Sequence, residues 1–124
     1  MTTLSAKLQA VLARIVGAAR KWGRDPADIR LLAVSKSWPA ATLREAAAAG
    51  QLAFGESYVQ EGLQKVADLC ELDLEWHFIG PLQANKTRLV AETFAWVHSV
   101  DRLKIAERLS LQRPSSLPAM AVCL

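Results

Sequence analysis

The residue of greatest chemical interest is a lysine at the end of an apolar run. Residues 29–36 read Ile-Arg-Leu-Leu-Ala-Val-Ser-Lys, a pattern typical of a buried parallel strand that ends at Lys36. α/β folds place their binding and catalytic groups at such strand ends. Apolar neighbours such as Leu32 and Val34 disfavour a charged ammonium and favour the neutral amine that adds to a carbonyl. The alternative is a strand-end lysine whose ammonium simply reaches solvent.

Short turns that contain glycine, serine or acidic residues follow the other apolar runs. They lie at residues 55–57, 80–81 and 99–101. In a barrel of parallel strands, the turns after the strands converge on one face. Polar residues gathered on that face, together with Lys36, favour a binding site over simple solvation.

Apolar spacing divides the chain into alternating helices and short strands. Helices are expected at residues 5–22, 40–49, 59–69, 85–92 and 102–110, and strands at 29–36, 52–54, 75–79, 96–100 and 119–124. Asp101 is the expected N-cap of the last helix. The alternation predicts the α/β class, with a parallel sheet and right-handed crossovers. A complete (β/α)8 barrel has about 250 residues, so the pattern predicts a TIM-type barrel truncated to about its first five strands, with a leading N-terminal helix.

Composition excludes several classes of protein. The 124 residues include 15 basic and 12 acidic side chains, for a net charge of +3. The basic residues form no block with interleaved aromatics, which argues against a nucleic-acid surface. No apolar run approaches the roughly 20 residues that span a bilayer, and the N-terminus lacks a signal-peptide core. Two cysteines without metal-site spacing complete the expectation of a cytoplasmic protein that binds no metal.

Three motifs in the right order resemble a known family. They are Leu-Leu-Ala-Val-Ser-Lys at 31–36, Phe-Gly-Glu-Ser-Tyr-Val-Gln-Glu at 54–61, and Trp-His-Phe-Ile-Gly-Pro-Leu-Gln-Ala-Asn-Lys at 76–86. The chain resembles the YggS/PROSC family of pyridoxal phosphate homeostasis proteins, which are similar in fold to the barrel domain of alanine racemase. The resemblance implies that pyridoxal 5′-phosphate is held as a Schiff base on Lys36. It also implies that residues 1–124 are the N-terminal half of a single cofactor-binding barrel domain.

The resemblance implies further cofactor contacts at four positions. Ser57 stands where the family's Gly-Glu-Asn triplet has asparagine, so it keeps a hydroxyl but loses the reach of an amide. His77 is expected either beside the cofactor ring or as a satisfied core histidine. Asn85 and Lys86 form either a polar rim over the pocket or simply a helix start. The family's contacts to the phosphate and to the pyridine nitrogen come from the C-terminal half of the barrel.

The resemblance implies a cofactor carrier rather than an enzyme. The expected role is intracellular homeostasis of pyridoxal 5′-phosphate, with apoenzymes that use this cofactor as partners. A racemase-like enzyme that uses the same cofactor, or a truncated fragment without activity, is the alternative. An open half barrel also leaves apolar strand edges, so we expect self-association through them.

Overall fold

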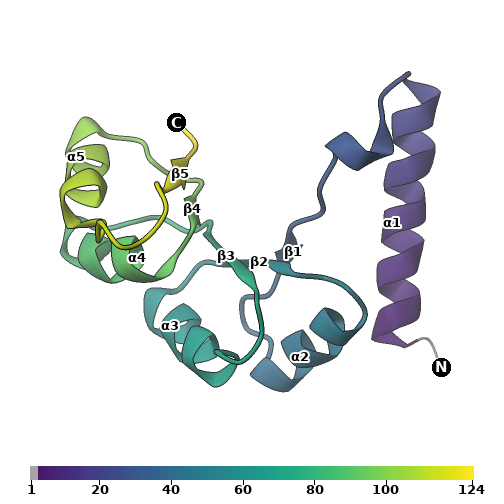
Figure 1. The fold of residues 1–124 in the computed structure, drawn as a ribbon, viewed down its shortest axis with the longest axis horizontal. Helices are drawn as coiled ribbons and strands as arrows, with labels where there is room; N and C mark the ends of the chain where they lie inside the picture. Colours follow the sequence, from purple (N-terminus) through teal and green to yellow (C-terminus); the bar gives the residue numbers. More distant parts are fainter. Residues whose placement is uncertain (1–2) are drawn as a thin grey trace.

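The structure is a computed structural model that describes residues 3–124, and it is an open α/β half ring (Figure 1). Five helices and five strands alternate along the chain: α1 (Leu4–Lys21), β1 (Ala33–Val34), α2 (Ala40–Ala48), β2 (Ala53–Glu56), α3 (Val59–Asp68), β3 (Glu75–Phe78), α4 (Thr87–Thr93), β4 (Trp96–Val97), α5 (Leu103–Gln112) and β5 (Ala121–Val122). Two short 3₁₀ helices, η1 (Pro26–Asp28) and η2 (Ala84–Lys86), lie between these elements.

The strands form one parallel sheet in the order β1-β2-β3-β4-β5. Each strand pairs with the next one along the chain, so each helix from α2 to α5 connects two neighbouring strands. Phe54 pairs with Trp76, and His77 pairs with Trp96. Sequential order with all strands parallel is the arrangement of the first five strands of a TIM-type barrel. The predicted fold class is therefore confirmed.

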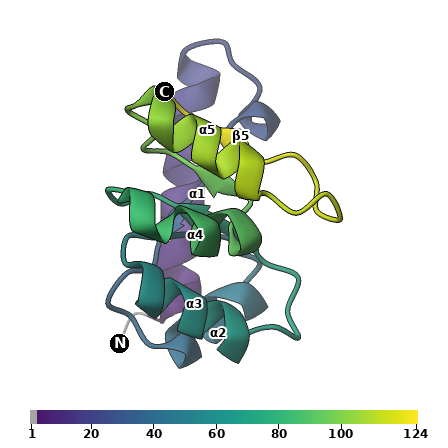
Figure 2. The ribbon, with the colours of Figure 1, turned by 90° about the vertical axis from the view of Figure 1, so that its left-hand side faces the viewer.

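The two faces of the sheet differ in cover. Helices α2 to α5 lie side by side on one face, and the other face carries no helix within residues 3–124 (Figures 1 and 2). The covered face holds the hydrophobic core, because alternate strand residues point toward the helices. Its fully buried members are Phe54, Phe78, Phe94, Val90, Ala91, Val97, Leu43, Leu69 and Ile105. The uncovered face carries the intervening residues of each strand.

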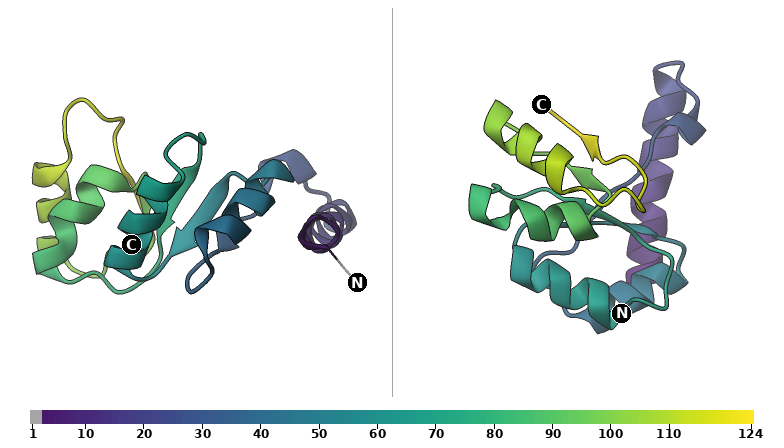
Figure 3. Two further views of the ribbon diagram at one scale, coloured as in Figure 1. Left: turned by 90° about the horizontal axis from the view of Figure 1, so that it is seen from below. Right: turned by 60° about the vertical axis from the view of Figure 1, so that its left-hand side comes forward.

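The leading helix α1 stands at the β1 end of the sheet and packs on α2 and η1 (Figures 1 and 3). The Thr3 hydroxyl accepts a hydrogen bond from the Ala6 N–H and caps the first turn. The helix ends before Gly23, whose φ of 69° lies in the left-handed region that glycine tolerates. Leu8 and Ala19 are its buried residues, so only part of its apolar stripe contributes to the core.

Several local predictions were wrong. The strands expected at 96–100 and 119–124 are reduced to Trp96–Val97 and Ala121–Val122. The strand expected at 29–36 is reduced to Ala33–Val34, and the side chain of Val34 is 53% exposed rather than buried. Within the described residues β1 pairs with β2 alone, through Ala33 and Val34. Residues 55 and 56 continue β2 instead of forming a turn. Arg102, not Asp101, stands at the N-cap of α5, without a side-chain cap.

Candidate functional site

Two of the five residues predicted for the site, Lys36 and Ser57, lie at the carboxyl ends of strands. Lys36 lies two residues beyond the end of β1, in an exposed turn. Ser57 directly follows β2 and is half-buried. The exposure of Lys36 differs from the apolar surroundings that Leu32 and Val34 predict for its amine.

The turn that carries Lys36 is held by both of its neighbours. The Ser35 N–H donates to Gly55 O at 2.9 Å, and the Ser35 hydroxyl donates to Gly55 O and to the Glu56 carboxylate. Ser37 has a φ of 67°, a left-handed conformation that side chains other than glycine rarely adopt. Its N–H donates to the Glu61 carboxylate. Lys36 thus lies between two residues whose backbones are fixed by β2 and α3.

A buried lysine lies beneath this turn. The Lys65 ammonium donates to Ser35 O at 2.7 Å, to both carboxylate oxygens of Glu56 at 3.0 and 3.1 Å, and to Glu61 Oε1 at 2.8 Å. Lys65 is 5% exposed and Glu56 is fully buried. The hydrogen bonds from Lys65 and from the Ser37 N–H lower the pKa of Glu61, so this carboxyl stays charged. We call Ser35, Glu56, Glu61 and Lys65 the Lys65 network.

The Lys65 network was not predicted from the sequence. Position 65 lies in the helix expected at 59–69, where a lysine ordinarily reaches solvent. One signal was available: Glu61 and Lys65 are spaced i, i+4 on one helix, the spacing of an ion pair. The contact of Lys65 with Glu56 is set by the packing of α3 on β2, which spacing within the helix does not reveal.

His77 lies in the middle of β3 on the uncovered face of the sheet, and it is 6% exposed. Its Nε2 lies 2.7 Å from Glu75 Oε1, and its Nδ1 lies 2.8 Å from His98 Nε2. Its ring stacks on Trp96 at a centroid distance of 5.3 Å. These contacts satisfy both ring nitrogens, as in a core histidine. A role of His77 beside a cofactor ring stays a prediction.

Hydrogen-bond chemistry fixes the tautomers of this histidine pair. A carboxylate only accepts hydrogen bonds, so the proton of His77 lies on Nε2 and points to Glu75. His77 Nδ1 then accepts from His98 Nε2–H. Burial lowers the pKa of His77, which keeps the ring neutral despite the nearby carboxylate. The Glu75 carboxylate also bonds Arg30 at 2.7 Å; burial raises its pKa, but the bonds from His77 and Arg30 outweigh that effect and lower it.

The turns after β2 and β3 touch through their backbones. Gly80 is buried, and a Cβ built on it would lie 2.8 Å from Ser57 Cα. The Ser99 hydroxyl, from the segment after β4, donates to Gly80 O. Ser57, Gly80 and Ser99 therefore lie together, as the turn positions predicted.

Asn85 and Lys86 lie in η2, between β3 and α4. Asn85 is exposed and Lys86 is half-buried. Arg108 of α5 fastens this segment, with Nε donating to Ala84 O at 3.0 Å and to Thr87 Oγ1 at 3.1 Å. The geometry is that of an anchored helix start, and a contact of either residue with a cofactor stays a prediction.

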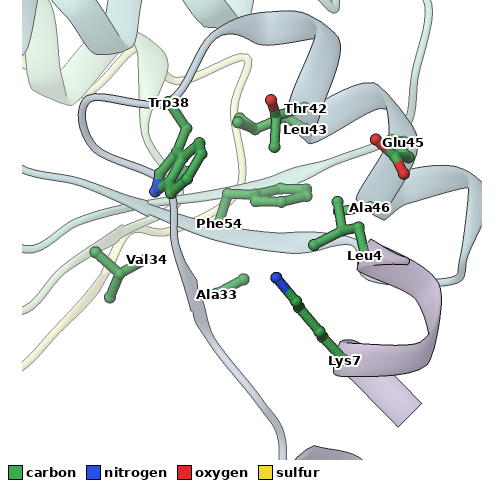
Figure 4. Close-up of a pocket in the computed structure, with 11 residues that line it drawn as sticks. Leu4, Lys7, Ala33, Val34, Trp38, Thr42, Leu43, Glu45, Ala46 and Phe54 are labelled. Atoms are coloured by element: carbon green, nitrogen blue, oxygen red, sulfur yellow. The ribbon is translucent and has the colours of Figure 1, made fainter. Parts of the chain in front are cut away.

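One cavity of about 410 Å³ lies apart from the Lys36 amine, between α1, β1 and α2 (Figure 4). Its walls are mostly apolar, with Phe54, Leu43 and Trp38 around it and the Lys7 side chain directed into it. Lys36 is not among its lining residues. The lysine site is therefore an open edge of the sheet rather than this cavity.

Two further findings concern residues 3–124. No group of three or more histidine, cysteine, aspartate or glutamate side chains is placed to hold a metal ion in this part of the chain. None of the helices described here has the length and apolar character that crossing a membrane requires.

Relatives of known name match the entire chain. It is 61% identical over 124 residues to the pyridoxal phosphate homeostasis protein of Pseudomonas aeruginosa and 53% identical over 127 residues to that of Escherichia coli. Both alignments cover 100% of this chain and 54% of the relative. The chain thus spans about half the length of the curated relatives it matches. No protein-family model matches it.

Solved structures match the fold as well. PipY of Synechococcus elongatus, determined with pyridoxal phosphate bound, is 48% identical with a TM-score of 0.69, over 82% of this chain and 47% of PipY. An unknown protein from Bifidobacterium adolescentis is 28% identical with a TM-score of 0.76, over 87% of this chain and 48% of the other. By sequence and by fold, the chain is similar to about half of a pyridoxal phosphate homeostasis protein.

Proposed function

We propose that this chain supplies the lysine of a pyridoxal 5′-phosphate carrier, and that Lys36 holds the cofactor as a Schiff base. The observation that carries the proposal is the place of Lys36: an exposed amine on a tethered turn, directly after the first strand of a parallel sheet. Two relatives named pyridoxal phosphate homeostasis protein, at 61% and 53% identity, support the proposal.

The chemistry of the residues present fits the aldehyde end of the cofactor. The neutral Lys36 amine forms a C=N bond to the aldehyde carbon, the aldehyde oxygen leaves as water, and the ammonium proton has gone to solvent. A tethered turn favours this condensation because it fixes the direction of the amine. Bound in this way, pyridoxal 5′-phosphate supplies an electron-withdrawing ring, whose chemistry belongs to the cofactor.

The other predicted residues keep smaller roles in the proposal. The Ser57 hydroxyl is a candidate partner for a polar group of the cofactor, because it follows the strand next to β1. Asn85 and Lys86 form a polar rim over the cofactor pocket, and His77 lies beside the cofactor ring from its position in β3. By resemblance, the phosphate contacts belong to the second half of the barrel domain, of which residues 1–124 are the first half. We therefore propose weak binding by this chain and no turnover, in the cytoplasm, with apoenzymes as recipients.

The test is to locate the adduct. Pyridoxal 5′-phosphate is added to the chain, the C=N bond is reduced with borohydride, and the labelled peptide is identified by mass spectrometry. We expect the label on Lys36, and loss of both label and imine absorbance in Lys36→Ala. Lys104→Ala, at an exposed position on α5, is the matched control and keeps the signal. A label spread evenly over the exposed lysines would contradict the proposal, and amino-acid turnover would favour the racemase-like alternative.

A further inference from the structure

The Lys65 network joins three segments that meet at the Lys36 turn. Its acceptors are Ser35 O from the segment after β1, the Glu56 carboxylate at the end of β2, and the Glu61 carboxylate on α3. Lys65 itself lies one helical turn beyond Glu61. A single ammonium therefore ties the start of the Lys36 turn to the neighbouring strand and to the helix.

Glu61 extends the network to the far side of Lys36. While it accepts from Lys65 at 2.8 Å, the same Glu61 oxygen also accepts the Ser37 N–H. Ser37 holds a left-handed φ of 67°, which costs energy in a residue other than glycine and persists only where surrounding contacts impose it. The Glu61 carboxylate is the contact that reaches this N–H. Both residues that flank Lys36 thus depend on the network.

Stability alone is a weak explanation for this arrangement. Two carboxylates surround one ammonium, and the desolvation of buried charges offsets most of their mutual attraction. Apolar side chains of similar volume would hold α3 on β2 at least as well. What apolar side chains lack is the ability to bond the two backbone groups, Ser35 O and Ser37 N–H. The polar contacts are directed at the backbone of the turn.

We propose that Lys65 and Glu61 are positioning residues, which fix the backbone on both sides of Lys36 and so set the direction in which its amine meets an aldehyde. This inference rests on the proposed role of Lys36 in forming the Schiff base. Lys65 acts through Ser35, and Glu61 acts through Ser37. Both are distinct from the residue that bonds the aldehyde.

Two variants at position 61 separate the effect of the hydrogen-bond acceptor from the effect of the negative charge. Glu61→Gln keeps an oxygen that accepts from Ser37 and Lys65, whereas Glu61→Ala removes it. The side chain of Glu61 is 30% exposed, so neither change opens the core. The readout is the rate of Lys36 labelling by pyridoxal 5′-phosphate and borohydride, divided by the rate at Lys104 in the same sample. We expect Glu61→Ala to lower this ratio by about tenfold or more, and Glu61→Gln to stay close to wild type.

A second readout needs no aldehyde. Amide hydrogen exchange at Ser37, followed by NMR, reports directly on the bond from its N–H to Glu61. We expect faster exchange at Ser37 in Glu61→Ala than in Glu61→Gln or wild type. The double variant Lys65→Met/Glu56→Gln tests whether the bond from the Ser37 N–H to Glu61 depends on the Lys65 ammonium. It removes the ammonium without leaving its buried partner charged, and it should also speed exchange at Ser37.

The outcomes distinguish the two proposals. If Lys36 takes no label in the wild-type chain, the proposed function fails and this inference fails with it. If Lys36 is labelled equally in wild type, Glu61→Ala and the double variant, the positioning role alone is wrong. Equal losses in Glu61→Gln and Glu61→Ala would also overturn it, because charge rather than geometry would then be decisive.

Discussion

Gly80 lies against the backbone of Ser57, which joins the turns after β3 and β2. A Cβ on Gly80 would lie 2.8 Å from Ser57 Cα and 2.9 Å from Ser57 C, and closer still to Ser57 O. Real Cβ atoms essentially never approach other heavy atoms so closely. Because the neighbouring atoms are backbone, no side-chain rotation relieves the clash. The position of Ser57 at the carboxyl edge of the sheet thus requires glycine, which has no Cβ, at residue 80.

Replacing Gly80 with alanine should push the two turns apart. We expect Gly80→Ala to lower the free energy of unfolding by about 1–3 kcal/mol, as overpacking does elsewhere. Chemical denaturation followed by circular dichroism measures the change. Gly17→Ala is the control: Gly17 lies within α1 with open space around it, so alanine should raise stability by about 0.5–1 kcal/mol. Equal effects at the two sites would contradict the close contact.

Removing the buried ammonium should destabilise the chain strongly. Lys65→Met leaves the fully buried Glu56 carboxylate without its ion-pair partner. We expect a loss of about 3–5 kcal/mol in the free energy of unfolding, the usual cost of breaking a buried pair from one side. Thermal and urea denaturation measure it.

The companion variants identify the cause of that loss. Lys65→Met/Glu56→Gln removes both charges and should recover much of the stability, because no unpaired carboxylate stays buried. Lys104→Met, at an exposed lysine on α5, should stay within about 0.5 kcal/mol of wild type. A double variant as unstable as the single one would show that packing, not charge, dominates.

The stability of the chain should depend on pH through His77. Burial lowers the pKa of the folded His77 below its usual 6.5, despite the opposing bond to Glu75; His98, Arg30 and Trp96 are its other neighbours. The unfolded chain therefore takes up a proton first as the pH falls. The stability that the neutral His77 contributes is fully present above pH 6.5, and it is lost as the pH falls toward the pKa of His77 in the folded chain.

The His77→Gln variant tests this sign. Titration of one proton changes the free energy of unfolding by at most about 1.4 kcal/mol per pH unit. We expect the wild-type chain to lose stability as the pH falls below about 6.5, and His77→Gln to show a flatter slope there. The window lies above the range in which Glu75 titrates, since the pKa of that carboxyl is lowered below 4.5. Identical slopes in the two proteins would be evidence against a neutral His77.

The two edges of the sheet should promote association. Val34 on β1 is 53% exposed and Val122 on β5 is 45% exposed, and each belongs to an edge strand in the described part of the chain. Light scattering across a concentration series should show species larger than one chain. Val122→Lys should shift the distribution toward single chains, because a charged edge resists strand pairing. A monodisperse single chain at every concentration would disprove this prediction.

The order of elements was predictable because it depends on local patterns. The apolar spacing of α3 and α5 and the glycine that follows α2 define helices before any contact forms. The length of β1 was not predictable, since it depends on which strands lie beside it. Residues 29–32 have the composition of a strand but lack a pairing neighbour within the described residues.

The candidate site was predictable only in part, for a similar reason. The place of Lys36 after the first strand follows from sequence, and so does the grouping of Ser57 with Gly80. The exposure of Lys36 does not follow, because it depends on which elements cover the sheet. The pairing of His77 with His98 depends on strand register, and the burial of Lys65 depends on how α3 sits on β2.

The three N–H groups of Lys65 meet acceptors on three different residues. An amine engaged in this way, at 5% exposure, is shielded from acylating reagents until the domain opens. Acetylation of Lys65 by an excess of such a reagent would then record opening events, while Lys104 reacts at once and reports the dose. Peptide mapping of the acetylated chain would thus measure how often the domain opens, from a lysine that the chain already carries.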